Sequence, residues 1–465
     1  MRDKFPALIA GLATNGWMDL VMTIGTRPVA GLRSLHLFAL ATGFIALNMG
    51  CALAAESRLP PCPVYLSPSW TDCYGIASTT TGETYAGEWK DGMRHGQGVL
   101  VLRTGAKYQG DFVYGKATGQ GTYLFRNGDK YVGEVLNGVV QGYGTLTASK
   151  DELTYTGEFA AFKFNGRGIL KTKAEGTYSG DFVNDLFQGQ GTLEKDGEKY
   201  MGAFVNSKFE GLGVLIEKDG AKYTGEFLRG LKHGQGTYAA KGNLYVGEFK
   251  FGLYEGQGTL TTIEGVTYTG GFREGKKFGK GVMTFANVER VAPKITPEMR
   301  MVRSPIVLGK VLRYEGDFLE DSRNGQGSAL MANGAVYVGA IEKDQFNGAG
   351  AITYPDGTLF EGTFLNQEIV GVGNVTYRDG FKYSGDAKGG QLNGYASITY
   401  PNGDVFSGDV VDGEATGVGT MMLAAGGKFV GEFRRGLYHG RGAMYDAANK
   451  LTQQAFWNNG RMISK

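Results

Sequence analysis

A short motif recurs along most of this 465-residue chain, and its spacing constrains the fold more than any other feature of the sequence. The stretch Tyr223–Tyr238 reads YTGEFLRGLKHGQGTY, and its skeleton, Y-x-G-E-F-x-x-G-x-x-x-G-x-G, recurs from residue 85 to the C-terminal region. Successive copies start 22 to 24 residues apart, except for one gap of 46, which is two periods. A fixed period in this range indicates a repeat architecture. The leading aromatic residues are Tyr85, Tyr108, Tyr131, Tyr155, Tyr178, Tyr200, Tyr223, Tyr245, Tyr268, Tyr314, Tyr337, Phe360, Tyr383, Phe406 and Phe429.

Each copy has the pattern of a β-hairpin. Alternation along the first segment places Tyr85, Gly87 and Trp89 on one face of a strand. The following Asp91-Gly92 is a turn signal, because both residues tolerate a positive φ. Glycine inside a strand weakens it unless a neighbour uses the vacancy. We therefore expect an aromatic ring to lie over the glycine backbone in every copy, and each hairpin to depend on its neighbours for stability.

The unit resembles the MORN repeat, and the resemblance covers roughly four fifths of the chain in about fifteen copies. It implies an all-β fold, an elongated single-layer array of stacked antiparallel β-hairpins. Similar proteins organise protein–protein contacts and, in several cases, associate with membranes or phospholipids. We expect repeats one to nine at residues 85–287, and repeats ten to fifteen with a C-terminal cap at 314–465.

Residues 1–55 differ in composition from the array. Arg27 and Arg33 precede an apolar run, Leu35 to Leu47, which ends in small residues before Glu56. This order predicts a secretory signal peptide and an exported protein, periplasmic or secreted. The translation start is open, with Met18 or Met22 as alternatives to the first residue. An uncleaved membrane anchor is the other interpretation of the apolar run.

Residues 56–84 are expected to form an N-terminal cap and a half repeat. After removal of the signal, the chain holds two cysteines, Cys62 and Cys73. An even count in an exported protein predicts one disulfide, with two free thiols as the alternative. Cys73-Tyr74-Gly75 stands ten residues before Tyr85, which is the spacing of Gly98 to Tyr108. The array therefore opens with the second half of an incomplete repeat.

Residues 288–313 lack the motif. The missing length equals one period, which favours a decayed repeat over an inserted loop, and in either case an interrupted ladder. The segment is basic and contains prolines, so it is a candidate binding segment or hinge, with a solvated linker as the alternative. Its cations are Arg290, Lys294, Arg300, Arg303, Lys310 and Arg313.

No constellation of residues points to catalysis, a metal or a cofactor. His95, His233 and His439 each precede the first glycine of a G-x-G, many repeats apart, so we expect turn residues rather than shared metal ligands. Eleven of the fifteen copies carry Glu or Asp after the motif glycine, so this carboxylate is expected to be structural. It would bond to the backbone of the next hairpin or pair with nearby Lys and Arg. The net charge of +2, with bases spread among acids, argues against nucleic-acid binding.

We therefore expect a non-enzymatic scaffold that binds a protein partner through its aromatic-rich sheet, because exposed aromatic rings are good anchors. Phospholipid binding is one alternative. Its further candidate cations are Lys276, Lys277 and Lys280, and Arg434, Arg435 and Arg441. Binding of a cell-wall glycan is another, and a homodimer is a further hypothesis. The repeat-defining aromatics of this sheet are Tyr85, Trp89, Tyr108, Phe112, Tyr223, Phe227, Tyr245 and Phe249. For any single ring, packing within the array is the alternative and is slightly favoured over contact with a partner.

Overall fold

The computed structural model describes residues 57–64, 70–148, 152–286 and 308–464, and every regular element within these ranges is a β-strand. The predicted signal peptide, residues 1–55, lies outside them. Within the same ranges no helix is long and apolar enough to cross a membrane. The chain divides into two compact units, Met1–Gly236 and Thr237–Lys465, which are described separately.

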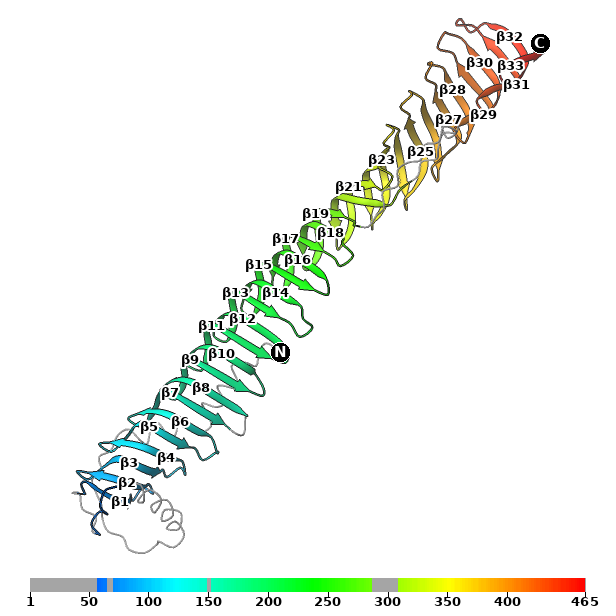
Figure 1. The fold of residues 1–465 in the computed structure, drawn as a ribbon. Helices are drawn as coiled ribbons and strands as arrows, with labels where there is room; N and C mark the ends of the chain where they lie inside the picture. The colour runs from blue at the N-terminus through cyan, green and yellow to red at the C-terminus, as the bar shows by residue number, and fades with distance from the viewer. Residues whose placement is uncertain (1–56, 65–69, 149–151, 287–307, 465) are drawn as a thin grey trace. The chain divides into compact units, whose positions relative to one another are not determined.

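The first unit is a run of antiparallel strands in which each pairs with the next along the chain (Figure 1). The strands are β1 (Cys73–Ser78), β2 (Thr84–Lys90), β3 (Met93–Val101), β4 (Lys107–Val113), β5 (Lys116–Leu124), β6 (Lys130–Leu136), β7 (Val139–Ala148), β8 (Leu153–Ala160), β9 (Lys163–Thr172), β10 (Gly176–Val183), β11 (Leu186–Lys195), β12 (Glu198–Val205), β13 (Lys208–Ile216) and β14 (Lys222–Leu228). The next strand, β15 (Leu231–Ala240), contains the boundary between the units.

The second unit repeats this arrangement from β16 to β33. Its strands are β16 (Asn243–Lys250), β17 (Leu253–Thr261), β18 (Thr267–Arg273), β19 (Lys276–Thr284), β20 (Val311–Leu319), β21 (Ser322–Met331), β22 (Val336–Glu342), β23 (Gln345–Thr353), β24 (Leu359–Leu365), β25 (Glu368–Thr376), β26 (Lys382–Lys388), β27 (Gln391–Thr399), β28 (Val405–Val411), β29 (Glu414–Met422), β30 (Lys428–Arg434), β31 (Leu437–Tyr445), β32 (Leu451–Asn458) and β33 (Arg461–Ser464). The predicted all-β fold of stacked antiparallel hairpins is confirmed.

The turn chemistry of the sequence is also confirmed. Asp91 and Gly92 both have positive φ, 50° and 70°, as a two-residue type I′ turn requires. Asn137 and Gly138 repeat this geometry at 55° and 84°. Because the twist of such a turn matches that of the flanking strands, each pair of strands is held in a fixed register.

The repeat tyrosines form the core, and each lies over the glycines of its own hairpin as predicted. A Cβ atom built on Gly213 would stand 2.6 Å from Tyr200 Oη and 2.7 Å from Tyr200 Cε2. Tyr200 also stacks on Phe209 of the same hairpin, with centroids 3.7 Å apart, and meets the edge of Phe227 of the next repeat at 5.0 Å. Each ring is therefore enclosed by its own repeat and by the following one.

A β-bulge follows the motif glycine in most hairpins and lets the strand bend around the ring. In β12 the register shifts between Gly202 and Ala203, and the Tyr200 hydroxyl donates a 3.0 Å hydrogen bond to the Ala203 carbonyl. Burial raises the pKa of Tyr223, which occupies the same position in the next repeat, to about 12. The phenol groups of the core are therefore neutral at physiological pH.

The expected interruption of the ladder after residue 287 is wrong. Strand β19 pairs directly with β20, and Gly281 faces Gly316 in the same register as other glycine pairs. Residues 287–307 lie outside the described ranges, and no strand separates β19 from β20 in the ladder. Pairing along the second unit therefore continues across the break in the sequence motif.

The N-terminal cap closes the exposed edge of β1. The structure joins Cys62 Sγ to Cys73 Sγ at 2.03 Å. Backbone hydrogen bonds of 2.8 Å run from Cys62 N to Tyr74 O and from Tyr74 N to Pro60 O. Trp70 takes the place of a repeat tyrosine, because a Cβ on Gly75 would meet its ring at 2.8 Å. Strand β1 is thus the half repeat expected from the sequence, with its outer edge partly covered.

Candidate binding groove

The repeat-defining aromatics are not the exposed anchors that the sequence suggested. Seven of the eight are buried, with at most 3% of the side chain exposed, and Trp89 is half-buried. The reason is that both strands of a hairpin direct their large side chains to the inner face, where the rings fill the space above the glycines. The alternative, that packing within the array takes up these rings, is therefore the one that holds, and the opposite face of the sheet is the available surface.

A row of glycines crosses the strands along this opposite face. In the first unit the cross-strand neighbours are Gly75, Gly87, Gly98, Gly110, Gly121, Gly133, Gly144, Gly157, Gly168, Gly180, Gly191, Gly202, Gly213 and Gly225. In the second unit the row runs Gly247, Gly258, Gly270, Gly281, Gly316, Gly327, Gly339, Gly350 and Gly362, and continues from Gly373 to Gly442 with Ala396 in place of one glycine. Tyrosine or phenylalanine rings cover one side of most of these glycines, and the other side is bare backbone.

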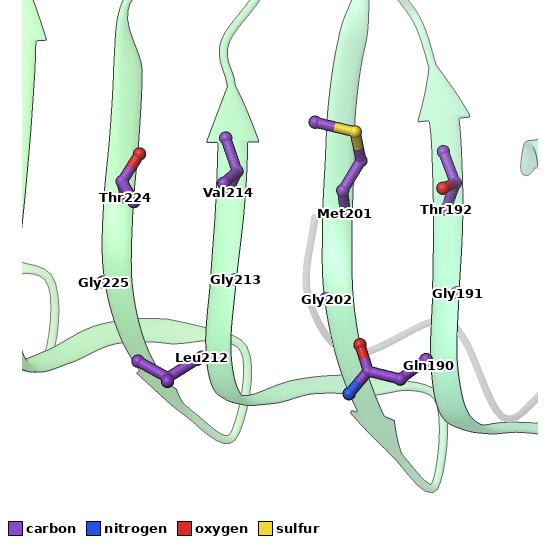
Figure 2. A pocket seen from close by; sticks show the side chains of 10 residues that line it. All are labelled: Gln190, Gly191, Thr192, Met201, Gly202, Leu212, Gly213, Val214, Thr224 and Gly225. Atoms are coloured by element: carbon purple, nitrogen blue, oxygen red, sulfur yellow. The ribbon is translucent and has the colours of Figure 1, made fainter.

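Two rows of side chains border the glycines, so the bare backbone is the floor of a groove. Figure 2 shows one stretch, where Thr192, Met201, Val214 and Thr224 stand in line on one side of the floor. Gln190 and Leu212 stand on the other side. The first row consists mainly of Thr, Ser, Val and Ile, and the second alternates the motif carboxylates with the residue between the two glycines of G-x-G.

The motif carboxylates are structural, as predicted, but they bond to the backbone of their own hairpin and not to that of the next one. Glu226 Oε1 accepts a 3.0 Å hydrogen bond from the backbone N–H of Gln235, and Glu248 Oε1 accepts one of 3.2 Å from Gln257. The same bond recurs for Asp111, Glu158, Asp317 and Glu432. Each carboxylate satisfies a backbone donor at the bulge, where the ladder is irregular.

The groove deepens where it crosses β11 to β14. A depression of about 690 Å³ lies over the four glycines of these strands. Its side-chain lining carries no formal charge, because Ala203 replaces the carboxylate of this repeat and Leu212 stands between the glycines of G-x-G. Every lining residue belongs to the first unit.

The structure describes only two of the six cations of the predicted binding segment. Arg290, Lys294, Arg300 and Arg303 lie outside the described residues. Arg313 lies in β20 and forms an exposed 2.7 Å ion pair with Glu315, and the Lys310 carbonyl accepts a hydrogen bond from Ala332 N.

The three lysines suggested for a lipid headgroup are ion-paired with the next hairpin. Lys276 meets Glu320 at 3.5 Å, and Lys277 meets Asp321 at 3.8 Å. Lys280 Nζ meets Asp317 at 2.7 Å and, through that bond, lowers the pKa of the Asp317 carboxyl. These ion pairs link β19 to β20.

The histidines lie in strands and not in turns, which corrects the sequence prediction. His95 lies in β3 opposite Glu88, and His439 lies in β31 opposite Glu432. Each precedes a glycine with positive φ at the bulge, which explains why the sequence resembles a turn. Among the described residues, no three His, Cys, Asp or Glu side chains are grouped to hold a metal ion.

The hairpin array with its glycine row and tyrosine core defines a β-repeat protein. The family model of the MORN repeat matches twelve segments that together cover more than half of the chain, and the protein belongs to this family. The matched residues are 85–107, 108–130, 131–150, 178–197, 200–222, 223–243, 245–265, 268–287, 314–336, 337–359, 383–405 and 429–447. Hairpins also form at Tyr155, Phe360 and Phe406, where the sequence predicts repeats that the family model does not match.

Known structures add little to this assignment. The TCP domain of Drosophila melanogaster SAS-4, in complex with a proline-rich motif of Ana2, is 12% identical over 42% of this chain and 82% of its own, with a TM-score of 0.22. The TCP10 domain of Danio rerio CPAP, in complex with a STIL peptide, is 10% identical over 60% of this chain and 99% of its own, with a TM-score of 0.19. Such scores carry no argument about function. No curated protein matches the sequence significantly.

Sequence reasoning identified the glycines, the rings and the carboxylates but missed the groove. A signal for it was present, since Gly202, Gly213 and Gly225 hold equivalent positions in consecutive strands. In-register pairing places the residues on either side of these glycines in two continuous rows on the opposite face. The valley between the two rows is the groove.

Proposed function

We propose that this protein is an exported, non-enzymatic MORN-repeat scaffold that binds an extended segment of a protein partner in the groove. The observation that carries the proposal is the row of bare glycines between two rows of side chains. The flanking Thr, Ser, Gln and carboxylate groups of the two rows can fix the orientation of another chain by hydrogen bonds.

The groove suits an extended chain better than a compact ligand. It crosses many strands, each about 4.8 Å from the next, and it offers similar chemistry at every step. A segment lying along it would gain many weak contacts, as recognition of extended peptides generally requires. Association with a second copy of the chain remains a separate hypothesis, which mass measurement by light scattering over a range of concentrations would test.

Site-specific photo-crosslinking tests the proposal. The photoreactive amino acid p-benzoylphenylalanine replaces Thr192 in the groove in one variant and Asp219, in an exposed turn, in a control. We expect a discrete protein adduct in the native cell from the groove position and none from the turn. Equal adducts from both positions, or adducts from the turn alone, would contradict binding in the groove. N-terminal sequencing of the mature chain tests export, with a start after residue 54 or 55 as the expected result.

A further inference from the structure

Four of the fifteen hairpins lack the charged side chain that the others carry, and one of them lies at the depression over β11 to β14. The residue after the motif glycine is Ala203 in β12, where eleven repeats have Glu or Asp. Nothing lies within 4 Å of a Cβ built on Gly211, whereas a glutamate oxygen stands 2.4 Å from the same point at Gly166 and 2.6 Å at Gly234. The loss of the carboxylate therefore leaves free space beside the glycine floor.

Apolar side chains line the depression over β11 to β14, which borders this space. Leu212 occupies the position between two glycines, where other repeats most often carry glutamine, and the residue is 73% exposed. Met201 and Val214 face it across the glycine floor (Figure 2). The three side chains make the lining of the depression largely apolar, which suits an apolar side chain of a partner.

Two carboxylates border this space. Glu210 is the cross-strand neighbour of Ala203, and its Oε2 accepts a 2.9 Å hydrogen bond from Arg229 N. Leu212 is the cross-strand neighbour of Glu226, whose exposed carboxylate is held by the Gln235 N–H. Directly opposed side chains in a sheet lie about 5 Å apart at Cβ. The closest cation on the same strand, Lys222, is paired in register with Ile216 and lies beyond the apolar lining.

We propose that the depression over β11 to β14 is the anchor subsite of the groove. It takes an aliphatic or aromatic side chain from an extended segment of a partner protein, and Glu226 receives a lysine or arginine of the same segment. The space lies between β12 and β13, so Glu226 in β14 is about 7 Å away along the groove, or about two residues of extended chain. Side chains two residues apart point the same way, so both can enter the groove. This inference rests on the proposed function and specifies its partner.

The test uses the full chain and a displayed library of short linear peptides. We expect recovered peptides to share an apolar residue with Lys or Arg two positions away. Binding of one such synthetic peptide, measured by calorimetry, should weaken at least about tenfold in Ala203→Glu and in Leu212→Gln, as loss of a buried anchor generally does. Both substitutions restore residues that other repeats carry, so they preserve the fold. Glu226→Gln should remove the preference for the basic residue.

Ala340→Glu is the matched control, because Ala340 holds the same repeat position in β22. It should leave the affinity unchanged. Peptides that lose affinity in Thr156→Arg, elsewhere on the groove wall, but not in Ala203→Glu would overturn the anchor subsite and leave the proposed function standing. Recovery of no groove-binding peptide, together with no crosslink from the groove, would contradict both.

Discussion

A single methyl group on the glycine row should destabilise the array locally, and Gly213→Ala is the sharpest case. The new Cβ would stand 2.6 Å from Tyr200 Oη and 2.7 Å from Cε2, where ordinary contacts are at least 3.4 Å. The Tyr200 ring has no room to move away, because Phe209 stacks on it and Phe204 packs edge-on against it. The ring centroids lie 3.7 Å and 5.1 Å from that of Tyr200. Overpacking of this kind costs about 1–3 kcal/mol, and loss of the tyrosine hydroxyl bond adds about 1 kcal/mol. We expect a total of about 2–4 kcal/mol.

Hydrogen exchange with mass spectrometry can measure this cost strand by strand. Protection of β12 and β13 should fall by roughly 30-fold to several hundred-fold, since about 1.4 kcal/mol corresponds to a factor of ten. Strands β4 and β5 should be unaffected, because stability in repeat arrays is passed between neighbours. Val214→Ala, the adjacent residue on the groove side, is the control. Protection within about a factor of two of the wild type would refute the packing argument.

The chain contains a natural precedent for relief of this clash. Ala396 replaces a glycine of the row in β27, and the same hairpin has Ala387 where most other repeats have phenylalanine. The smaller Ala387 leaves Tyr383 room to move away from the extra methyl group. By the same reasoning, Gly213→Ala should cost less in a Phe204→Ala background than in the wild type, and a double-mutant cycle measures that coupling.

Three further predictions follow from the core, the carboxylates and the cap. Glu226→Ala should lower the free energy of unfolding in urea by about 1 kcal/mol through loss of the bond from Gln235 N–H, and Glu226→Gln should retain most of it. Because burial raises the pKa of Tyr223 from 10.0 to about 12, its stabilising effect is complete below pH 10 and lost as the pH rises from 10 to 12. Tyrosinate absorbance and circular dichroism should therefore change together in that window, and ionisation near pH 10 without unfolding would contradict burial. Replacing Cys62 and Cys73 by serine should cost the cap about 2–3 kcal/mol, seen as faster exchange of β1 with the repeats unchanged; equal protection in both forms would exclude a stabilising role.

Much of the fold can be predicted from local chemistry alone. The turn at Asp91-Gly92 fixes the two-residue hairpin, and alternation places Tyr85, Gly87 and Trp89 together on one face. The ring over the glycine backbone also follows from sequence, since a bare glycine in a strand needs a neighbour that uses its space. These inferences need only contacts within one repeat, which is why they survive comparison with the structure.

Whether the repeat aromatic rings are exposed to solvent could not be settled from contacts within one repeat. Whether the inner face is open depends on the bulge between Gly87 and Glu88, which bends the strand so that both arms of the hairpin enclose Tyr85. The continuity from β19 to β20 is likewise a long-range pairing that local motifs do not encode. The absence of the motif after residue 287 indicated an interruption, although Gly281 and Gly316 keep the register of the row.

The central claim is that repeat tyrosines form the core and leave the glycine groove as the exposed binding surface. Nitration of the folded chain with tetranitromethane, mapped by mass spectrometry, tests this claim most directly. We expect Tyr114, Tyr143 and Tyr395, which are 60%, 58% and 65% exposed, to be modified rapidly. Tyr108 and Tyr223, with no exposed area, should react only after unfolding. Modification of the repeat tyrosines at the same rate as Tyr143 would contradict the account.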